Sequence, residues 1–468
     1  MKALLKKLGE FSIGPLFAAL VGFITVPLVT HIISVEEYAR ASMFTLAQTT
    51  IALFLYLGMD QAFVREFHEG EEPGKLLSNA MLLPAIFTVI LDAVLLLMRS
   101  QVSIWLFDTP DEHLAIYALA LLFPAMLAER FALVKLRMEE RGFAYSFFTV
   151  LLKILTLVFT LLLLLGYEKS FRSVVYALSL AEILCGVILF ILLITRTKLS
   201  LRSLDRELMG QMLRYGLPLI PASALMWILT SMDKTMLRSM STYTELGLYS
   251  GAFKIVSALS ILQTCFTLFW TPLSYRWYQA DVDKRNFSTV MHLVSFGMTC
   301  LCLMLLLAKD LVAWVLGANF ANAIYIFPFI MLHPIMYTMS ETTVMGISFQ
   351  RRTGNNIITS ALAGIVNTVL NLTLIPVLGA KGAAIATGIS YIVFFWARTL
   401  ISRSLWWAFP VGQYVFYTFL IVINCALHTF ITGWIPYTVS AASLLLVALV
   451  NLKTLLGDLR FLKNDIQE

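Results

Sequence analysis

The chain has 468 residues, of which 59% are hydrophobic and only 13% are charged. Soluble globular domains carry roughly 25% charged residues, and their interiors cannot hide an apolar fraction this large. The composition therefore excludes a soluble domain and indicates a protein that folds in a lipid bilayer. The net charge of +6 is spread over short loops between apolar segments and forms no single basic face, which excludes a nucleic-acid partner.

The amino terminus resembles a signal peptide, because Lys2, Lys6 and Lys7 precede an apolar run over residues 11–33. That run is long enough to span the bilayer and lacks a small-residue cleavage site, so we expect an uncleaved first membrane helix. A helix needs roughly 20 apolar residues to cross the hydrocarbon core. This criterion predicts fourteen spans, over residues 11–33, 41–61, 76–98, 113–134, 143–166, 171–194, 212–232, 246–270, 289–308, 323–345, 357–379, 382–401, 411–432 and 434–456.

The lysines and arginines of the connecting loops indicate how the spans are oriented. If the amino terminus is cytoplasmic, the inner loops hold nearly three times as many basic residues as the outer loops. Membrane proteins carry this excess on the cytoplasmic side. We therefore expect a multi-pass protein of the bacterial inner membrane with both termini in the cytoplasm. No loop is long enough for a folded domain, so the function must lie in the helical bundle.

The two halves of the chain resemble each other at an offset of 208 to 212 residues. Five pairs of residues keep this offset: Glu37 and Glu245, Arg65 and Arg276, Trp105 and Trp314, Glu129 and Glu341, and Gly142 and Gly354. The repeat predicts a six-helix lobe over residues 1–200, a second over 201–405, and an additional helix pair with a tail over 406–468. Because each lobe has six spans, both enter the membrane from the same side. Such parallel repeats occur in transporters, although a scaffold can also arise by duplication.

Two strings in the second half resemble a known family. Residues 213–221 read LRYGLPLIP, and residues 367–376 read NTVLNLTLIP and are followed by GAKGAAIAT at 379–387. These strings are similar to the polysaccharide-synthesis family, the O-antigen or Wzx-type flippases of the MOP transporter superfamily. Asn367 and Asn371 share one face of their helix, where we expect them to bond a neighbouring helix.

The resemblance implies an all-α fold of about fourteen transmembrane helices, with two six-helix lobes around a cavity and an optional helix pair. It implies an undecaprenyl-diphosphate-linked oligosaccharide as substrate, turned from the cytoplasmic to the periplasmic leaflet by alternating access. Membrane lipid, a polysaccharide polymerase and chain-length machinery are the partners that it implies.

Several ionisable residues fall inside the predicted spans, where each costs about 2.5–3.5 kcal/mol on insertion scales and is a functional candidate. Lys153 and Lys254 lie near mid-depth, and Arg130 lies near an inner end. Because the substrate's diphosphate needs cationic partners in a dry cavity, these three are the candidate substrate-binding residues. The alternative is that each pairs with a nearby acid, such as Glu182, and holds the bundle together.

The acidic residues are candidates for coupling or gating. Glu129 and Glu341 occupy equivalent positions near the inner ends of their spans, where we expect them to cap Arg141 and Arg352. Glu182, Asp92 and Glu341 are candidates for proton coupling, because a carboxylate in the membrane can titrate near neutral pH. The adjacent residues Asp233 and Lys234 end the seventh span at the outer face, as part of an outer gate or of the connection to the next span.

Other functions remain open at this stage. A multidrug or small-molecule antiporter of the same superfamily shares the twelve-helix core, and a lipid II flippase is a variant of the first interpretation. A membrane glycosyltransferase, polymerase or ligase needs a large outer loop or an acidic motif at the membrane face, and neither is visible, so we expect no enzyme. The five cysteines lie in apolar segments without metal-ligand spacing to histidine, which predicts no metal site. Proton or sodium coupling is expected in place of a cofactor.

Overall fold

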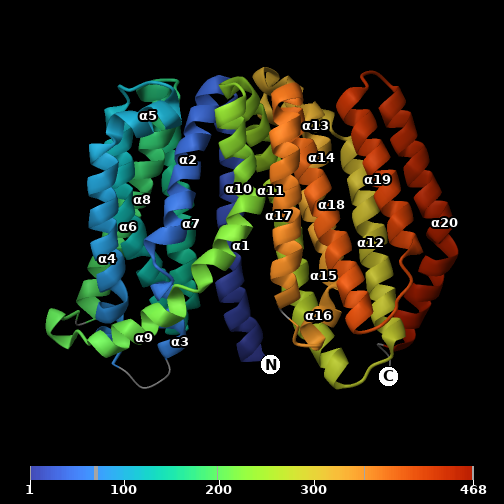
Figure 1. Cartoon of the computed structure of the whole chain (residues 1–468), viewed down its shortest axis with the longest axis horizontal. Helices are drawn as coiled ribbons and strands as arrows, with labels where there is room; N and C mark the ends of the chain where they lie inside the picture. The colour runs from blue at the N-terminus through green and yellow to red at the C-terminus, as the bar shows by residue number, and fades with distance from the viewer. Residues whose placement is uncertain (1, 68–71, 198, 353, 466–468) are drawn as a thin grey trace. The chain divides into compact units, whose positions relative to one another are not determined.

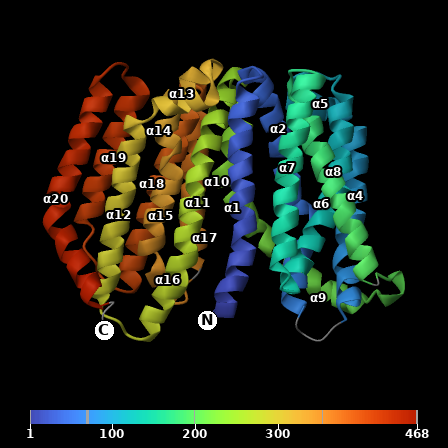
Figure 2. The same ribbon diagram turned by 180° about the vertical axis from the view of Figure 1, so that it is seen from behind.

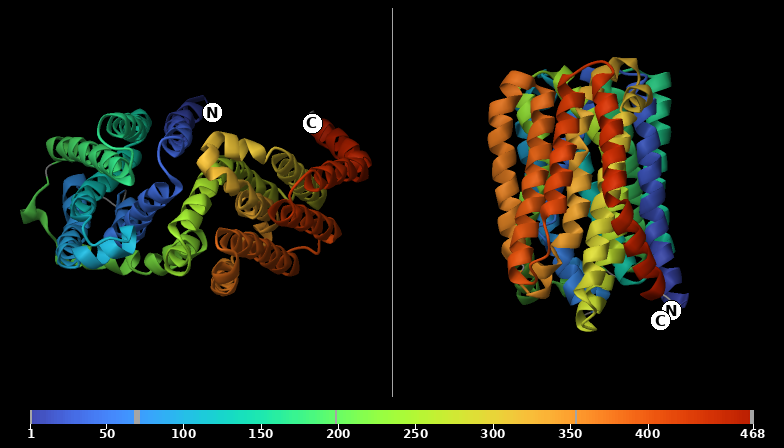
Figure 3. Two further views of the ribbon diagram at one scale, coloured as in Figure 1. Left: turned by 90° about the horizontal axis from the view of Figure 1, so that it is seen from above. Right: turned by 90° about the vertical axis from the view of Figure 1, so that its right-hand side faces the viewer.

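The computed structural model describes residues 2–67, 72–197, 199–352 and 354–465, and every regular element in these ranges is helical. The helices form two compact units, one up to Trp227 and one from Ile228 onward. Figures 1 and 2 show the helices from two opposite sides, and Figure 3 shows those of each unit end-on. The predicted division into residues 1–200, 201–405 and 406–468 stays a prediction.

The N-terminal unit contains α1 (Lys2–Thr30), α2 (Val35–Leu55), α3 (Met59–Glu66), α4 (Pro73–Leu97), α5 (Arg99–Phe107), α6 (His113–Met138), α7 (Gly142–Gly166), α8 (Phe171–Arg196), the short 3-10 helix η1 (Leu201–Ser203), α9 (Arg206–Gly216) and the start of α10 (Leu219–Met240). In Figure 2, α1 lies alongside α7, and the two helices are in contact along their length. The helix α7 begins one residue before the predicted span and ends with it, because its apolar run has sharp polar edges.

The C-terminal unit contains the rest of α10, α11 (Tyr243–Gln279), α12 (Lys284–Leu307), α13 (Asp310–Leu316), the 3-10 helix η2 (Ala318–Tyr325), α14 (Phe327–Ile330), α15 (Leu332–Thr343), α16 (Met345–Phe349), α17 (Gly354–Leu378), α18 (Ala380–Leu405), α19 (Gly412–Phe430) and α20 (Ile435–Asp465). The single span predicted over residues 323–345 is broken, with a bend of 57° between η2 and the helical segment 327–343. Pro328 lies at the start of α14, where proline is tolerated and marks a new helix start.

In the described part of the chain, nine helices are long and apolar enough to cross a membrane, and up to twelve if each of three bent pairs is one span. Two further apolar stretches, Gly14–Thr30 and Ile435–Asn451, are shorter than these. The predicted all-helical, multi-pass architecture is therefore confirmed. The predicted number of fourteen spans is not confirmed.

A close backbone contact fixes the break between α2 and α3. Gly58 has a φ of 69°, a left-handed conformation that glycine adopts without steric cost. A Cβ atom on Gly58 would lie 2.3 Å from the carbonyl oxygen of Gly216 at the end of α9. Glycine is therefore required on both chain segments at this crossing, and Gly216 belongs to the string over residues 213–221.

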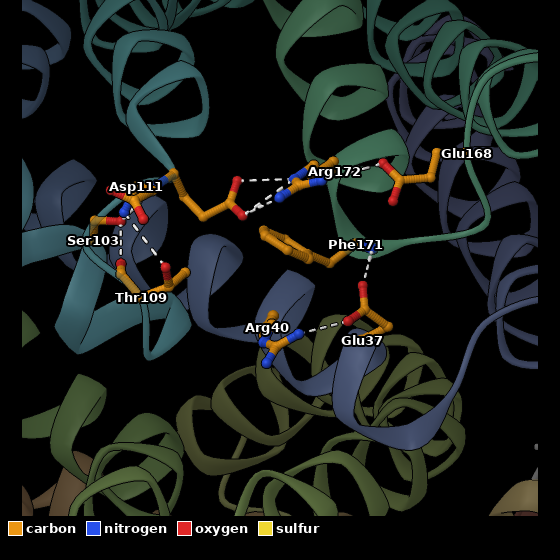
Figure 4. A network of polar contacts seen from close by, with 9 residues as sticks. Glu37, Arg40, Ser103, Thr109, Asp111, Glu168, Phe171 and Arg172 are labelled. Carbon is orange, nitrogen blue, oxygen red and sulfur yellow. Dashed lines mark hydrogen bonds and ion pairs between the residues drawn. The ribbon is translucent and has the colours of Figure 1, made fainter.

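The two units repeat one hydrogen bond between helix ends. In the N-terminal unit, Glu37 Oε2 accepts a hydrogen bond from the backbone N–H of Phe171, at 2.7 Å (Figure 4). In the C-terminal unit, Glu245 Oε2 accepts one from the backbone N–H of Ala380, also at 2.7 Å. Each glutamate thus satisfies a free donor at the start of α8 or α18. The offset of 208 predicted for Glu37 and Glu245 therefore corresponds to an equivalent structural contact.

Around this hydrogen bond the N-terminal unit adds an ion-pair network. Arg40 donates to Glu37 at 2.6 Å, and its guanidinium lies 5.7 Å from the ring centre of Phe171. Arg172 binds both carboxylate oxygens of Glu112 and lies 3.5 Å from Glu168. Figure 4 shows Arg40 and Arg172 on either side of Phe171. This end of the unit is held by charged groups from α2, α8 and the residues that flank α6 and α8.

Polar side chains join α19 and α20 to each other and to α12. His428 lies 2.9 Å from Ser440, and Asn424 donates to Ser443 at 3.0 Å. Near the middle of α20, Asn451 contacts His292 of α12 at 3.0 Å. These groups are all buried. The last two helices are therefore attached to the C-terminal unit by a row of hydrogen bonds.

Candidate functional site

An ion pair joins α3 and α6 in the N-terminal unit. Arg130 donates from Nε and Nη2 to Asp60 Oδ2, at 2.9 and 2.6 Å. The guanidinium also lies 5.6 Å from the ring centre of Tyr56. The Asp60 side chain is 6% exposed, whereas that of Arg130 is 40% exposed. Arg130 is therefore paired with an acid, as the alternative interpretation expects, yet a large part of its cationic surface remains accessible.

Beside this ion pair lies a cavity of about 310 Å³, contained in the N-terminal unit. It is lined by Thr49, Ala52, Leu53, Tyr56, Gly58, Asp60, Gln61, Arg130, Leu219, Ile220, Ser223 and Trp227. The lining comes from α2, α3, α6 and α10, with the linker between α2 and α3. The break at Gly58 directs α3 away from α2 and so brings Asp60 to this wall. A cavity with one ion pair and several aromatic and polar groups suits a ligand that is both anionic and polar.

Three predicted residues from three helices meet beside Arg130. Glu129 on α6 forms a side-chain hydrogen bond with Glu182 on α8, and it interacts electrostatically with Lys153 on α7. Lys153 is exposed, so its ammonium is not enclosed by the acids. The sequence places these residues in separate spans, and the structure brings them together.

The C-terminal unit contains a buried carboxylate with four neutral donors. Asp233 on α10 is 1% exposed. Its Oδ1 accepts hydrogen bonds from the amides of Asn367 and Asn371 on α17, at 3.0 and 2.6 Å. Its Oδ2 accepts from the hydroxyls of Tyr249 on α11 and Thr387 on α18, at 2.6 and 2.7 Å. The carboxylate thus joins four helices, and the helix-bonding role expected of the two asparagines is observed.

One oxygen in this network has no donor. Asn371 Oδ1 is buried and has no hydrogen-bond partner in the described structure. Buried polar atoms are nearly always satisfied by protein, water or an ion. An unpaired carbonyl oxygen beside a buried carboxylate is the combination of ligands that a small cation or a protonated group would satisfy.

Two lysines stand next to this network. Lys234 lies 5.1 Å from the ring centre of Phe253 and interacts electrostatically with Lys254 on α11. Lys254 is exposed, and Lys234 is partly buried. The ring of His333 lies 6.2 Å from that of Phe253 and 4.3 Å from that of Tyr391. The arrangement combines two like charges with a row of aromatic rings, and an anion between the lysines would relieve their repulsion.

The remaining predicted acids have separate environments. Glu341 forms an ion pair with Arg398 at 3.0 Å, and both side chains are about 90% buried, with exposures of 9% and 10%. The partner expected for Glu129, Arg141, instead lies 3.4 Å from Glu139. Asp92 on α4 has a buried Oδ1 without a hydrogen-bond partner. No contact joins Asp92 to the networks above among those that the structure describes.

Sequence reasoning missed Asp60 as the partner of Arg130, and it did not identify Asp233 as the partner of Asn367 and Asn371. Asp60 lies at the last turn of a predicted span, and its partner Arg130 is 70 residues away. The signal that could have found it is an aspartate directly after the Leu57–Gly58 break, inside an apolar run.

Comparisons with known proteins agree with this architecture. A family model described as "Polysaccharide biosynthesis protein" matches residues 4–276. The "Lsg locus putative protein 1" of Haemophilus influenzae is 24% identical over 330 residues, which cover 68% of this chain and 78% of that protein.

Two solved structures share the fold. The lipid II flippase MurJ in an inward closed conformation has a TM-score of 0.70 at 16% identity, covering 95% of this chain and 99% of that one. An inward-facing multidrug resistance MATE family transporter of the MOP superfamily has a TM-score of 0.62 at 16% identity, covering 83% of this chain and 93% of that one. The chain therefore has the fold of MOP superfamily transporters, as the sequence predicts.

Proposed function

Because the chain belongs to the polysaccharide biosynthesis protein family, we propose that it flips an undecaprenyl-diphosphate-linked oligosaccharide from the cytoplasmic to the periplasmic leaflet. The product would feed the synthesis of a surface polysaccharide, such as an O-antigen, a capsule or an exopolysaccharide. It acts as a transporter and not as an enzyme. The observation that carries the proposal is the accessible cationic surface of Arg130 on an intramembrane cavity.

The negative charge of a diphosphate is complementary to the cationic side chains of Arg130, Lys153 and Lys254. A diphosphate brings about two negative charges into a poorly solvated site, where they need charge-assisted hydrogen bonds. Asp60 binds the Nε and Nη2 edge of the Arg130 guanidinium, and the 40% of this side chain that is exposed would present its remaining N–H groups to phosphate oxygens. Lys153 supplies a further exposed ammonium in the N-terminal unit, and Lys254 supplies one in the C-terminal unit.

Alternating access is the transport mechanism that we propose. Solved MOP transporters of this fold have inward-facing and outward-facing conformations. The broken helices of this chain, with bends of 49° at α2–α3 and 57° at η2–α14, are points at which such a change can occur. Near the predicted inner ends, Glu129 would act as a gating residue, and Glu341 would have a structural role through its ion pair with Arg398. Asp92 remains a candidate coupling residue because of its unpaired oxygen.

Ion coupling is assigned to Asp233 in this proposal. A buried carboxylate with an unpaired amide oxygen beside it can exchange a monovalent cation, either a proton or sodium. Lys234, next in the chain, interacts electrostatically with Asp233 and Lys254, so it links the ion site to the substrate cations. In the N-terminal unit, Glu182, which interacts with Glu129, is the candidate for proton coupling.

The test measures flipping of a lipid-linked oligosaccharide by the purified protein in vesicles. The double variant Lys153→Ala/Lys254→Ala should lower the rate about 100-fold or more, since each charged hydrogen bond contributes roughly 1.5–3 kcal/mol. The matched control is Lys169→Ala/Lys284→Ala, which removes two exposed lysines outside the predicted spans. Equal rates for the test variant and the wild type would remove the two lysines from the mechanism.

The same vesicles distinguish the alternatives. The fold of the lipid II flippase MurJ covers 95% of this chain, so lipid II is the second candidate substrate. Faster flipping of lipid II than of an oligosaccharide lipid would favour that candidate. Export of a cationic drug without flipping of either lipid would favour the multidrug antiporter.

The proposed location is the inner membrane, with both termini in the cytoplasm and with the polysaccharide polymerase and chain-length machinery as neighbours. Protease digestion of a tag at either terminus from the periplasmic side would contradict this topology.

A further inference from the structure

A pocket of about 100 Å³ lies at one end of α6, α7 and α8, outside the networks described above. Its charged lining consists of Lys135, Arg141 and Arg196 with a single acid, Glu139. By the loop-charge bias, this end of the helices faces the cytoplasm. The pocket thus lies at the depth of the lipid headgroups, where the inner leaflet meets the protein.

The charges of the pocket do not balance. Lys135 Nζ lies 2.7 Å from Glu139 Oε1, and Arg141 Nε lies 3.4 Å from Glu139 Oε2. One carboxylate therefore serves two cations, and Arg196 adds a third positive charge to the lining. The Lys135 side chain is only 9% exposed, so its charge cannot be solvated fully by water. The excess of about two positive charges favours a bound anion.

The start of α7 adds donors to the same place. Arg141 is the N-cap residue of α7, and no side chain caps this helix end. The first backbone N–H groups of a helix lack partners within the helix, and its dipole favours negative charge there. Ala144, in the first turn, lines the pocket. The cations and the helix end therefore point to one anionic group.

The other walls of the pocket are hydrocarbon. Phe148 and Leu192 line it. Their chain neighbours Phe147 and Ile191 are 51% and 55% exposed, and in a bilayer such side chains contact acyl chains. A ligand that fills the pocket and continues along these side chains is anionic at one end and apolar at the other. A volume of about 100 Å³ holds a single phosphate group and excludes an oligosaccharide.

We propose that this pocket binds the phosphate of an anionic glycerophospholipid of the inner leaflet, with its acyl chains along α7 and α8. The lipid completes the charge balance of Lys135, Arg141 and Arg196 and fastens the ends of α6, α7 and α8 to each other. Basic pockets between membrane helices on the cytoplasmic side are suited to such headgroups. The site is independent of the proposed transport function.

The test is native mass spectrometry of the purified full chain titrated with phosphatidylglycerol. The wild type should bind it more tightly than zwitterionic phosphatidylcholine. Arg141→Gln/Arg196→Gln should weaken phosphatidylglycerol binding about 10- to 30-fold, because each basic residue near the headgroups contributes about 1 kcal/mol. The matched control is Arg202→Gln/Arg206→Gln, which removes two exposed arginines of the same predicted face.

Three results would overturn the proposal. The first is equal weakening in the test and control variants, which would indicate a general charge effect. The second is equal affinity of the wild type for the two phospholipids. The third is displacement of phosphatidylglycerol by undecaprenyl diphosphate or by inorganic phosphate, which would assign the pocket to the substrate or to free phosphate. Arg141→Lys/Arg196→Lys keeps both charges and should retain binding within about threefold, which separates loss of charge from loss of fold.

Discussion

The N-terminal and C-terminal units share one hydrogen bond between helix ends but differ in the charged residues of their interiors. Glu37 and Glu245 each accept a hydrogen bond from the first backbone N–H of a helix, with the same N···O distance of 2.7 Å. By contrast, Glu129 adjoins Glu182, Lys153 and an accessible Arg130, whereas its counterpart Glu341 is enclosed with Arg398. Contacts that position helices have been retained through the duplication, and the charges beside the cavity have diverged. We therefore expect the residues that act on substrate and ion to be among the charges that differ between the two units.

The largest expected effect concerns the buried carboxylate of Asp233 in the C-terminal unit, which has no counterpart in the N-terminal unit. Residues 21–25, at the equivalent position, contain no acid, whereas Asp233 is bonded by four side chains. Asp233→Ala leaves four buried groups without their acceptor, and we expect the free energy of unfolding to fall by about 3 kcal/mol or more. Denaturant titration in mixed micelles measures it.

Asp233→Asn keeps the shape of the side chain and removes its charge. This variant should fold yet lose the dependence of transport on a proton or sodium gradient, measured in vesicles with each gradient imposed separately. Unchanged dependence on both gradients would show that the ion acts elsewhere.

The second prediction compares the two equivalent glutamates. Glu341→Ala leaves the buried Arg398 without its ion-pair partner, so the free energy of unfolding should fall by roughly 3 kcal/mol. Glu129→Ala should cost less than half as much and should lower transport instead, because Glu129 adjoins accessible cations. The free energy of unfolding and the flipping rate are measured for both variants. Similar losses of unfolding free energy in the two variants would contradict a structural role for Glu341 and a transport role for Glu129.

The third prediction concerns the retained hydrogen bonds between helix ends. Glu37→Ala and Glu245→Ala each remove the acceptor of one backbone N–H, and each should cost about 1–2 kcal/mol of unfolding free energy. Because Glu37 also holds Arg40 in a partly exposed ion pair, its loss should exceed that of Glu245 by no more than about 1 kcal/mol. A difference of about 2 kcal/mol or more, measured by the same titration, would break the equivalence of the two units.

The smallest effect concerns Asp205, at the start of α9. Hydrogen bonds from the backbone N–H of Leu208 and from Lys75 hold the pKa of this carboxyl below its ordinary value of 3.8. A lowered pKa in the folded state means that the stabilisation is present above pH 3.8 and is lost as the pH falls through the lower folded value. The Tm of the wild type should therefore exceed that of Asp205→Asn at pH 7, and the two Tm values should converge as the pH falls below 3.8.

Sequence patterns predict those parts of the fold that depend on local composition. The spans predicted at 143–166 and 171–194 agree with α7 and α8 within two residues, because their apolar runs have polar edges. The segment 323–345 is predicted as one helix, yet it is broken near residue 326. On the N-terminal side of this bend, Phe320 packs against Gly251, where a Cβ atom added to the glycine would lie 3.0 Å from the ring. No local pattern reveals such a contact.

The same limit applies to the candidate site. The intramembrane charges are visible in the sequence because each one interrupts an apolar run. Their partners are not visible, because Arg130 meets Asp60 across 70 residues and Asp233 meets Thr387 across 154. The sequence therefore identifies which residues are costly to insert, and the tertiary structure alone shows which acid or amide each one meets.

The hydrogen bonds among α12, α19 and α20 have a consequence for how the protein is assembled. In hydrocarbon, the side chains of His292, Asn424 and Asn451 find no water to replace a missing partner. Deletion of residues 406–465 would remove Asn451, which His292 of α12 contacts at 3.0 Å. The final hairpin therefore covers a polar side of α12, and we expect the C-terminal unit to complete its folding only after that hairpin has entered the membrane.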